Sequence, residues 1–109
     1  MPYTYRVLGQ SSPSATTNTD VYTVGAGKQA IISTITVANR SASARTYRIA
    51  IRPAGATLAN QHYIAYDVTI LANDTTALTL GVTLAATDVV TVYASTTDLS
   101  FGIFGTEIS

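Results

Sequence analysis

Arginines are the residues of this chain whose type and spacing best suit specific chemistry. Five of its six basic residues are arginines, and four lie close together, at Arg40, Arg45, Arg48 and Arg52. Arg48 and Arg52 are four residues apart, so on an extended strand they share a face. A guanidinium binds a carboxylate through two parallel hydrogen bonds. The group therefore predicts either an interface with acidic side chains of a neighbouring subunit, or ion pairs with Asp67 or Asp88 of the same chain.

Histidine, cysteine and carboxylates give no pattern of a catalytic or metal site. The chain has one histidine, His62, and no cysteine, which excludes a disulfide framework and a thiolate zinc site. Nucleophilic catalysis needs a base and a group that orients the base, and His62 stands alone. The carboxylates are scattered, and most fall at expected turns or strand starts, where aspartate binds nearby backbone N–H groups. We expect no catalytic residue, no metal ligand and no cofactor, and hence no enzyme.

Tyrosines form the second set of candidate binding residues. The chain has seven tyrosines and no tryptophan. Tyr63 and Tyr66 lie on opposite parities of one expected strand, so at least one should face outward. An outward tyrosine packs in a protein interface, or its ring can stack on a sugar. The candidate interface residues are therefore Arg40, Arg45, Arg48, Arg52, Tyr63 and Tyr66.

The strands that must position these residues are visible as period-two alternation of apolar and polar side chains. In Gln29–Pro53, one parity holds Ile31, Ile35 and Val37 of a first run. A second run places Tyr47, Ile49 and Ile51 on one parity. The link between the runs, residues 39–44, consists of small and polar residues and includes Asn and Ser, which favour turns. We predict a β-hairpin with a long loop across this stretch.

Further strands are expected on both sides of this stretch. Tyr3–Leu8 reads as an edge strand, and Gln10–Thr19 as a loop or extended arm. The others are expected at Asp20–Val24, His62–Ile70, Thr75–Leu84 with a bulge at Gly81, Asp88–Ser95 and Leu99–Ile108. Seven to eight antiparallel strands with regular turns indicate an all-β chain. We predict one β-sandwich domain over residues 1–109, jelly-roll or immunoglobulin-like, with residues 1–19 as edge strand plus arm.

The composition favours contact with other protein. Hydrophobic residues make up 47% of the chain and charged residues 11%, against a usual share of about 25%. The net charge is zero, so self-repulsion is weak. No basic stripe interleaves with aromatic residues, so no nucleic-acid partner is expected. No run approaches the roughly 20 apolar residues of a membrane-spanning helix, so we expect no such helix and no membrane partner. The first ten residues lack the basic and apolar regions of a signal peptide, so we expect no signal peptide.

Four long phrases together carry a resemblance to a known family. They are YRVLGQSSPSATTNTDVYTV, GKQAIISTITVANRSASARTYRIAIRPAGA, NQHYIAYDVTILANDTTALTLGVTLAATDVVTVYAST and LSFGIFGTEI. The chain resembles small virion structural proteins of tailed bacteriophages, including phages of cyanobacteria. Proteins of this kind occur as head decoration (cement) proteins and in tail-associated roles. The resemblance implies a β-sandwich that docks onto a capsid or tail lattice, and it brings no catalytic residues.

We therefore expect a non-enzymatic capsid decoration protein, made in the host cytoplasm and located on the capsid surface. Its expected partners are the major capsid protein or other virion proteins, and copies of itself in a homo-oligomer, with a trimer favoured. The expected contacts are the 40–52 hairpin, residues 1–19 and exposed tyrosines. Two alternatives stay open: a tail, neck, baseplate or fibre-associated module, and a carbohydrate-binding adhesion module.

Overall fold

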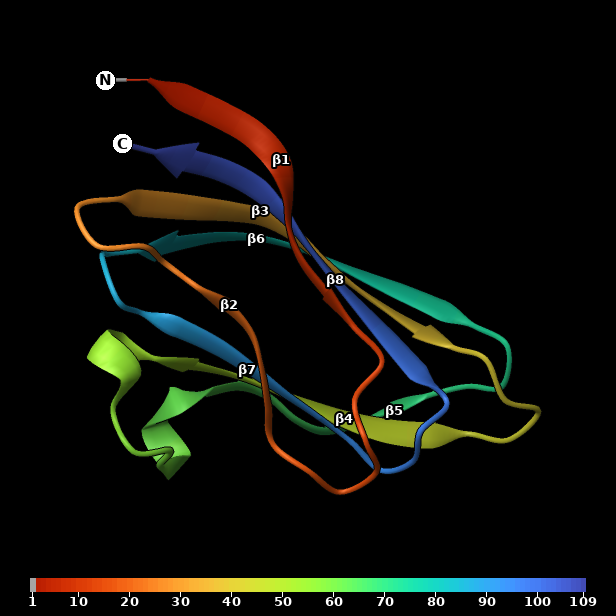
Figure 1. Cartoon of the computed structure of the whole chain (residues 1–109). Helices are drawn as coiled ribbons and strands as arrows, with labels where there is room; N and C mark the ends of the chain where they lie inside the picture. Colours follow the sequence, from red (N-terminus) through yellow and green to blue (C-terminus); the bar gives the residue numbers. More distant parts are fainter. Residues whose placement is uncertain (1) are drawn as a thin grey trace.

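The computed structural model describes residues 2–109, which form eight β-strands joined by turns and loops (Figure 1). The strands are β1 (Tyr3–Ser11), β2 (Thr19–Thr23), β3 (Gln29–Asn39), β4 (Arg45–Arg52), β5 (Tyr63–Ile70), β6 (Thr75–Leu84), β7 (Val89–Ala94) and β8 (Leu99–Ile108). Two short 3-10 turns, η1 (Pro53–Gly55) and η2 (Asn60–His62), lie between β4 and β5. The predicted all-β class is confirmed.

The strands form two four-stranded antiparallel sheets packed as a sandwich. Sheet A has the order β1-β8-β3-β6 and sheet B the order β2-β7-β4-β5. Four antiparallel pairs nest inside one another along the chain: β1 with β8, β2 with β7, β3 with β6 and β4 with β5. This nesting is the jelly-roll arrangement of two Greek keys. Of the two predicted architectures it selects the jelly roll, because immunoglobulin domains order their strands differently.

The predicted hairpin over Gln29–Pro53 is wrong, although both of its strands exist. β3 pairs with β6 and β8, whereas β4 pairs with β5 and β7. Residues 40–44 carry the chain from one sheet to the other. Packed sheets lie about 10 Å apart, a gap that five residues span easily. Alternation shows which side of a strand is buried, but it does not show which strand lies beside it.

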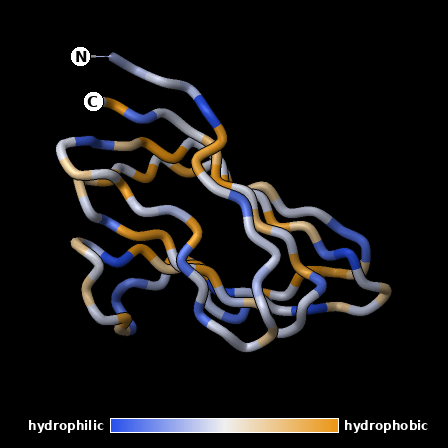
Figure 2. Tube along the Cα trace, in the orientation of Figure 1, coloured by the Kyte–Doolittle hydropathy of each residue, from blue (hydrophilic) through white to orange (hydrophobic). Residues whose placement is uncertain are grey.

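The core lies between the sheets and consists of inward side chains from all eight strands. Its largest fully buried members are Tyr47, Ile32, Ile35, Ile49, Ile70, Leu99, Ile103, Val24, Val37, Val90 and Val92. Figure 2 shows hydrophobic segments alternating with polar ones along the strands, as expected for strands with one buried face. The molecule measures 45 × 28 × 20 Å.

Bulges change which residues of sheet A face inward. The register of β3 against β8 and β6 shifts between Ile32 and Thr34. Ile32 is therefore buried with Ile35, whereas Ile31 faces solvent, contrary to the predicted parity. On β6 the extra residues opposite this shift include Gly81, so the predicted bulge there is confirmed.

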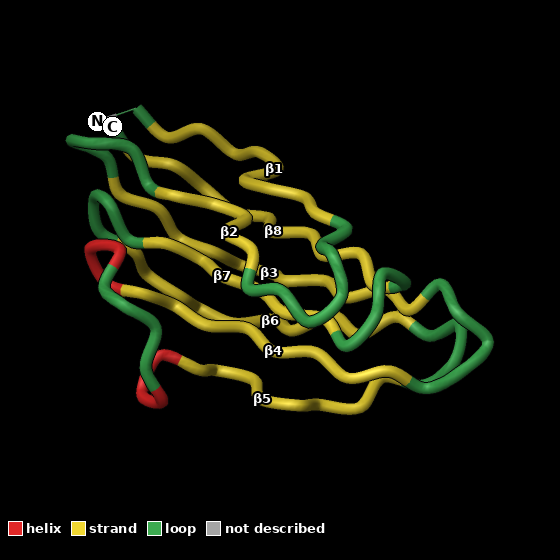
Figure 3. The backbone as a smooth tube through the Cα atoms, turned by 60° about the horizontal axis from the view of Figure 1, so that its bottom comes forward, coloured by secondary structure: helices red, strands yellow, loops and turns green. Residues whose placement is uncertain are grey.

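The edges of both sheets and the two chain ends are visible in Figure 3, where β5 lies at the border of sheet B. β1 forms one border of sheet A, as predicted, and extends to Ser11. The following link does not project as a free arm. Pro13 is buried, Ala15 forms a bridge with Ala94, and the Thr16 N–H donates to the Ala94 carbonyl at 2.8 Å.

Candidate interaction surfaces

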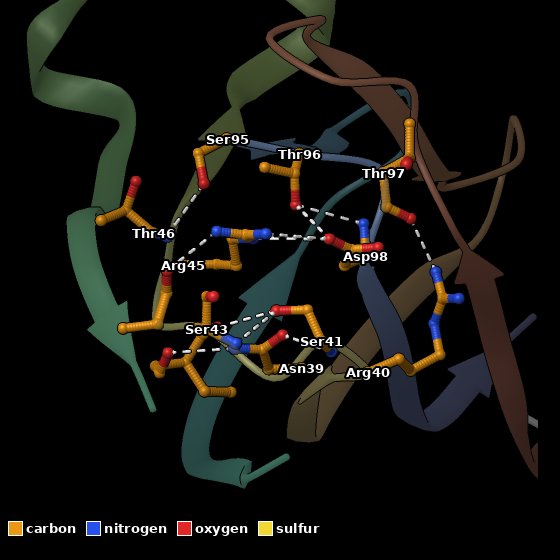
Figure 4. A network of polar contacts seen from close by, with 12 residues as sticks. Asn39, Arg40, Ser41, Ser43, Arg45, Thr46, Ser95, Thr96, Thr97 and Asp98 are labelled. Carbon is orange, nitrogen blue, oxygen red and sulfur yellow. Dashed lines mark hydrogen bonds and ion pairs between the residues drawn. The ribbon is translucent and has the colours of Figure 1, made fainter. Parts of the chain in front are cut away.

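The four clustered arginines separate into two groups in the structure. Arg48 and Arg52 lie on the outer face of sheet B, as their spacing on β4 predicts. Arg40 and Arg45 lie at the end of the sandwich where β3 leads into β4 and β7 leads into β8 (Figure 4). The candidate residues therefore do not form one continuous patch.

Arg40 and Arg45 use their guanidinium groups to hold loops of the same chain. Arg45 Nε lies 3.4 Å from Asp98 Oδ2. Arg40 donates to the Thr97 carbonyl at 2.7 Å and to the Ser100 hydroxyl at 2.9 Å. A further bond at 2.8 Å reaches the Ser12 hydroxyl, next to β1. These contacts join three loops, so both arginines have a structural role here (Figure 4).

Asn39 lies at the centre of this same end of the sandwich, and its role was not predicted from the sequence. It is buried at the end of β3, and its Nδ2 donates to the carbonyls of Ser43, Ile70 and Leu71 at 2.8, 3.2 and 3.1 Å. Its Oδ1 accepts the Ser41 N–H at 3.0 Å. One amide thus satisfies backbone groups of the β3–β4 loop and of the β5–β6 turn.

Arg48 lies at the centre of a cluster of aromatic and charged side chains on the outer face of sheet B. Its guanidinium lies between two aromatic rings, 4.3 Å from the Tyr66 centroid and 4.2 Å from the Tyr93 centroid. It also binds Asp67 through two hydrogen bonds, at 2.6 and 3.2 Å. These hydrogen bonds hold the pKa of Asp67 below its usual value and raise the pKa of Arg48. Cation, carboxylate and rings therefore fix one another.

A β-bulge on β5 produces this arrangement. The register of β4 against β5 shifts between Tyr47 and Ile49, so Tyr66 and Asp67 both lie opposite Arg48. Asp67 has a φ of +50°, a backbone conformation that is strained for a residue other than glycine. Bulges of this kind redirect side chains. Here the bulge presents an aromatic ring and a carboxylate to the same arginine.

Tyr63 and Tyr66 meet on this face and border a groove. Their rings lie edge to face, with centroids 4.8 Å apart and an interplanar angle of 82°. Together with Asn60 they line a groove of about 370 Å³. Their opposite parity in sequence does not separate them, because the register of β5 shifts between Tyr63 and Ala65.

Arg52 completes the outer face of sheet B through contacts within the chain. Its Nη2 lies 2.9 Å from Asp20 Oδ1, and its Nε donates to the Thr91 hydroxyl at 3.0 Å. The Thr91 hydroxyl in turn donates to the same Asp20 oxygen at 2.9 Å. This ladder links β2, β7 and β4 across the sheet.

A second surface lies on the outer side of β1 and is largely apolar. Tyr3 and Tyr5 are 62% and 80% exposed, and Val7 is also exposed. In the sheet register Tyr5 aligns with Thr106 of β8, which aligns with the exposed Ile31 of β3. The outer face of sheet A is therefore apolar close to its β1 edge.

The interior side of the same strands holds a buried carboxylate. Glu107 on β8 accepts the Tyr22 hydroxyl at 2.7 Å and Arg6 Nη1 at 3.0 Å. Lys28 Nζ lies 3.9 Å from the same carboxylate. Burial and the hydrogen bond to Glu107 raise the pKa of Tyr22. Two cations and one donor thus compensate the burial of this charge.

Within residues 2–109, no three His, Cys, Asp or Glu side chains gather where they could hold a metal ion. The buried His62 has a local role, because its Nδ1 accepts the Ala59 N–H at 3.0 Å and closes the η2 turn. Among the described helices none has the length and apolar character needed to cross a membrane. Comparisons with protein-family models, curated proteins and solved structures find no match to this chain.

Proposed function

We propose that this protein is a non-enzymatic structural protein of a tailed-phage virion, which binds the assembled capsid as a decoration protein and stabilises it. The resemblance of the sequence to small virion proteins supports this role, as does the low share of charged residues. The observation that carries the proposal is the exposed apolar edge of sheet A, at residues 3–7 of β1.

The four edge strands differ in how well they could accept another chain. β2 has five residues and a register shift, and β5 has two register shifts. Neither β2 nor β6 carries a large exposed hydrophobic side chain among the described residues. β1 pairs with β8 without a shift from Tyr3 to Val7, and that stretch exposes three such side chains. A regular apolar edge is where a further protein strand or surface adds.

The area available on β1 fits a contact that is completed in a lattice. A buried aromatic side chain removes roughly 200 Å² from water, so Tyr3 and Tyr5, at 62% and 80% exposure, offer about 280 Å² per copy. At roughly 25 cal/mol per Å² this gives about 7 kcal/mol. Association itself costs on the order of 4–15 kcal/mol. One edge alone therefore binds weakly, and neighbouring contacts on an assembled shell make the binding stable.

As proposed, the protein stabilises the shell by binding to it, without a chemical reaction. A protein that binds the assembled shell and not its free subunits stabilises the shell by mass action, by about 2.7 kcal/mol at a hundredfold excess over the dissociation constant. The expected hairpin contact at residues 40–52 is replaced in this proposal by β1, which lies within the expected 1–19 segment. The reason is that Arg45, Arg48 and Arg52 already pair with carboxylates of their own chain.

The first test is the copy number of this chain in purified particles, measured by quantitative mass spectrometry against the major capsid protein. A ratio of about one, or about one third, is expected for a protein that follows the symmetry of the shell. A ratio far below these values would contradict decoration and place the protein in the tail, neck, baseplate or fibre.

A pair of variants tests the β1 edge itself. Tyr5→Lys places a charge in the exposed edge and should leave the fold intact, because Tyr5 is largely in solvent. The matched control is Thr79→Lys, which alters an exposed position on β6 at the opposite edge of the same sheet. Particles with Tyr5→Lys should lose the protein and melt at lower temperature, while the control particles remain decorated. Full decoration with both variants would show that β1 is not the contact.

A further inference from the structure

We propose that the groove on the outer face of sheet B binds a neutral carbohydrate, by stacking of a pyranose ring on Tyr66 or Tyr63. The groove is lined by Asn60, Tyr63 and Tyr66 and has a volume of about 370 Å³. That volume lies in the lower part of the range of small-molecule sites. The inference does not rest on the proposed role in a virion.

The two rings have the geometry that such a ligand needs. Tyr63 and Tyr66 stand at 82° to each other with centroids 4.8 Å apart, so they form a corner. A pyranose has a face of C–H groups that packs on an aromatic ring, and hydroxyls around its rim that need hydrogen-bond partners. Asn60 lines the same groove, and its amide offers both donors and an acceptor. Two tyrosine hydroxyls add further partners.

The charges beside the groove favour a neutral ligand. Arg48 lies against Tyr66, but its positive charge is compensated by two hydrogen bonds to Asp67. Asp67 is in turn compensated by Arg48. No unpaired charge of the described residues lines the groove, so neither a carboxylated nor a cationic sugar gains a partner there.

The lining residues are held in place before any ligand binds. Tyr66 contacts both Arg48 and Tyr63. The strained backbone of Asp67 fixes the bulge that brings Tyr66 to this face. Asn60 begins the η2 turn, which His62 closes through its bond to the Ala59 N–H. A preformed site loses little side-chain entropy on binding, and this favours affinity for a small ligand.

The site and the β1 edge lie on different sheets, so both can be occupied at once. β1 borders sheet A, whereas Tyr63 and Tyr66 lie on β5 of sheet B. A copy that docks through β1 therefore leaves the groove open. This separation also makes the two hypotheses distinguishable, because each has a variant that leaves the other surface unchanged.

The experiment uses the full chain on an array of neutral and acidic glycans, followed by NMR titration with D-glucose, D-galactose, D-mannose and N-acetyl-D-glucosamine. We expect binding to at least one neutral sugar, with shifts of the resonances of Asn60, Tyr63 and Tyr66. Tyr66→Ala should weaken that binding about tenfold or more. Asn60→Ala, which leaves the Arg48 contacts intact, should weaken it as well. Tyr5→Ala is the control and should bind normally.

Three results would overturn the inference. The first is the absence of any array signal and of any shift at the three lining residues with every sugar tested. The second is binding that survives both Tyr66→Ala and Asn60→Ala in folded protein, which would place the sugar elsewhere. The third is consistently tighter binding of acidic than of neutral glycans, which would contradict the neutral character of the groove.

Discussion

The hydrogen bond between Tyr22 and Glu107 gives a test of how the sandwich holds a buried charge. Tyr22 of β2 is 7% exposed, and its hydroxyl donates to Glu107 of β8 at 2.7 Å, which joins the two sheets. Tyr22→Phe keeps the ring and removes only this donor. A hydrogen bond to a charged group contributes about 1.5–3 kcal/mol. With an unfolding entropy of about 2.1 cal/mol/K per residue, each kcal/mol lowers the melting temperature by about 4.4 °C, so we expect a loss of about 7–13 °C.

Tyr47→Phe is the matched control for this change. Tyr47 is 1% exposed, and burial alone, with no hydrogen-bond partner among residues 2–109, raises the pKa of its hydroxyl. Its loss should therefore change the free energy of unfolding by less than about 0.5 kcal/mol. Both variants are measured by thermal and urea denaturation followed by circular dichroism at pH 7. Equal losses in the two variants would refute the assignment of the effect to the pairing with Glu107.

The pH dependence of Tyr22 gives a second readout of the same bond. Burial and the bond to Glu107 raise the pKa of Tyr22 above its usual value near 10. A pKa that is raised on folding contributes stability below the unfolded value, and that stability is lost as the pH rises through the folded value. The difference in stability between the native protein and Tyr22→Phe should therefore narrow above about pH 10. A constant difference would contradict the raised pKa.

Three further variants, with one control, test other parts of the structure by the same denaturation measurements. Asn39→Asp should destabilise the fold by on the order of 3 kcal/mol, because a carboxylate would face three backbone carbonyls in a buried site; wild-type stability would show that the amide is not the organising group. Gly105→Ala should cost on the order of 3 kcal/mol or more, since a Cβ there would overlap the backbone of β3. Gly81→Ala, where no described atom lies within 4 Å of a new Cβ, is its control and should change little. Arg48 lowers the pKa of Asp67, so this pair stabilises the fold above about pH 4, and the stabilisation is lost as the pH falls. In Asp67→Asn, the free energy of unfolding should therefore decrease less between neutral and acid pH than in the native protein.

The strands could be located from the sequence because alternation is a local property. β3 and β4 begin and end within a residue or two of the two predicted runs. Their partners could not be predicted, because pairing depends on contacts between distant segments. Asn39 at the end of β3 did not distinguish the two arrangements in the sequence, because Asn also favours hairpin loops. Its burial and its bonds to two separate loops are visible only in the structure.

The candidate site was predicted only in part. Arg48, Tyr63 and Tyr66 do come together, but the bulge that joins them could not be predicted, since Asp67 adopts a positive φ without being glycine. Tyr93 was not singled out, because its contact with Arg48 requires that β7 lie beside β4. Arg40 and Arg45 were grouped with Arg48 by proximity in sequence, although they lie at the end of the sandwich in the structure.

The internal pairing of charges determines how this molecule can recognise a partner. Five of its six basic side chains form ion pairs within the chain, and the sixth, Arg40, donates to a carbonyl and two hydroxyls. Long-range electrostatic steering is therefore weak. Apolar contact at β1 and ring stacking at the sheet B groove depend little on ionic screening. Binding to particles and to sugars should thus change less than about threefold between roughly 0.05 and 0.5 M NaCl, measured by particle co-sedimentation and by NMR titration. A steep loss of binding to particles or to sugars with rising salt would show that charged groups make that contact, and the arginines would then be the candidate residues.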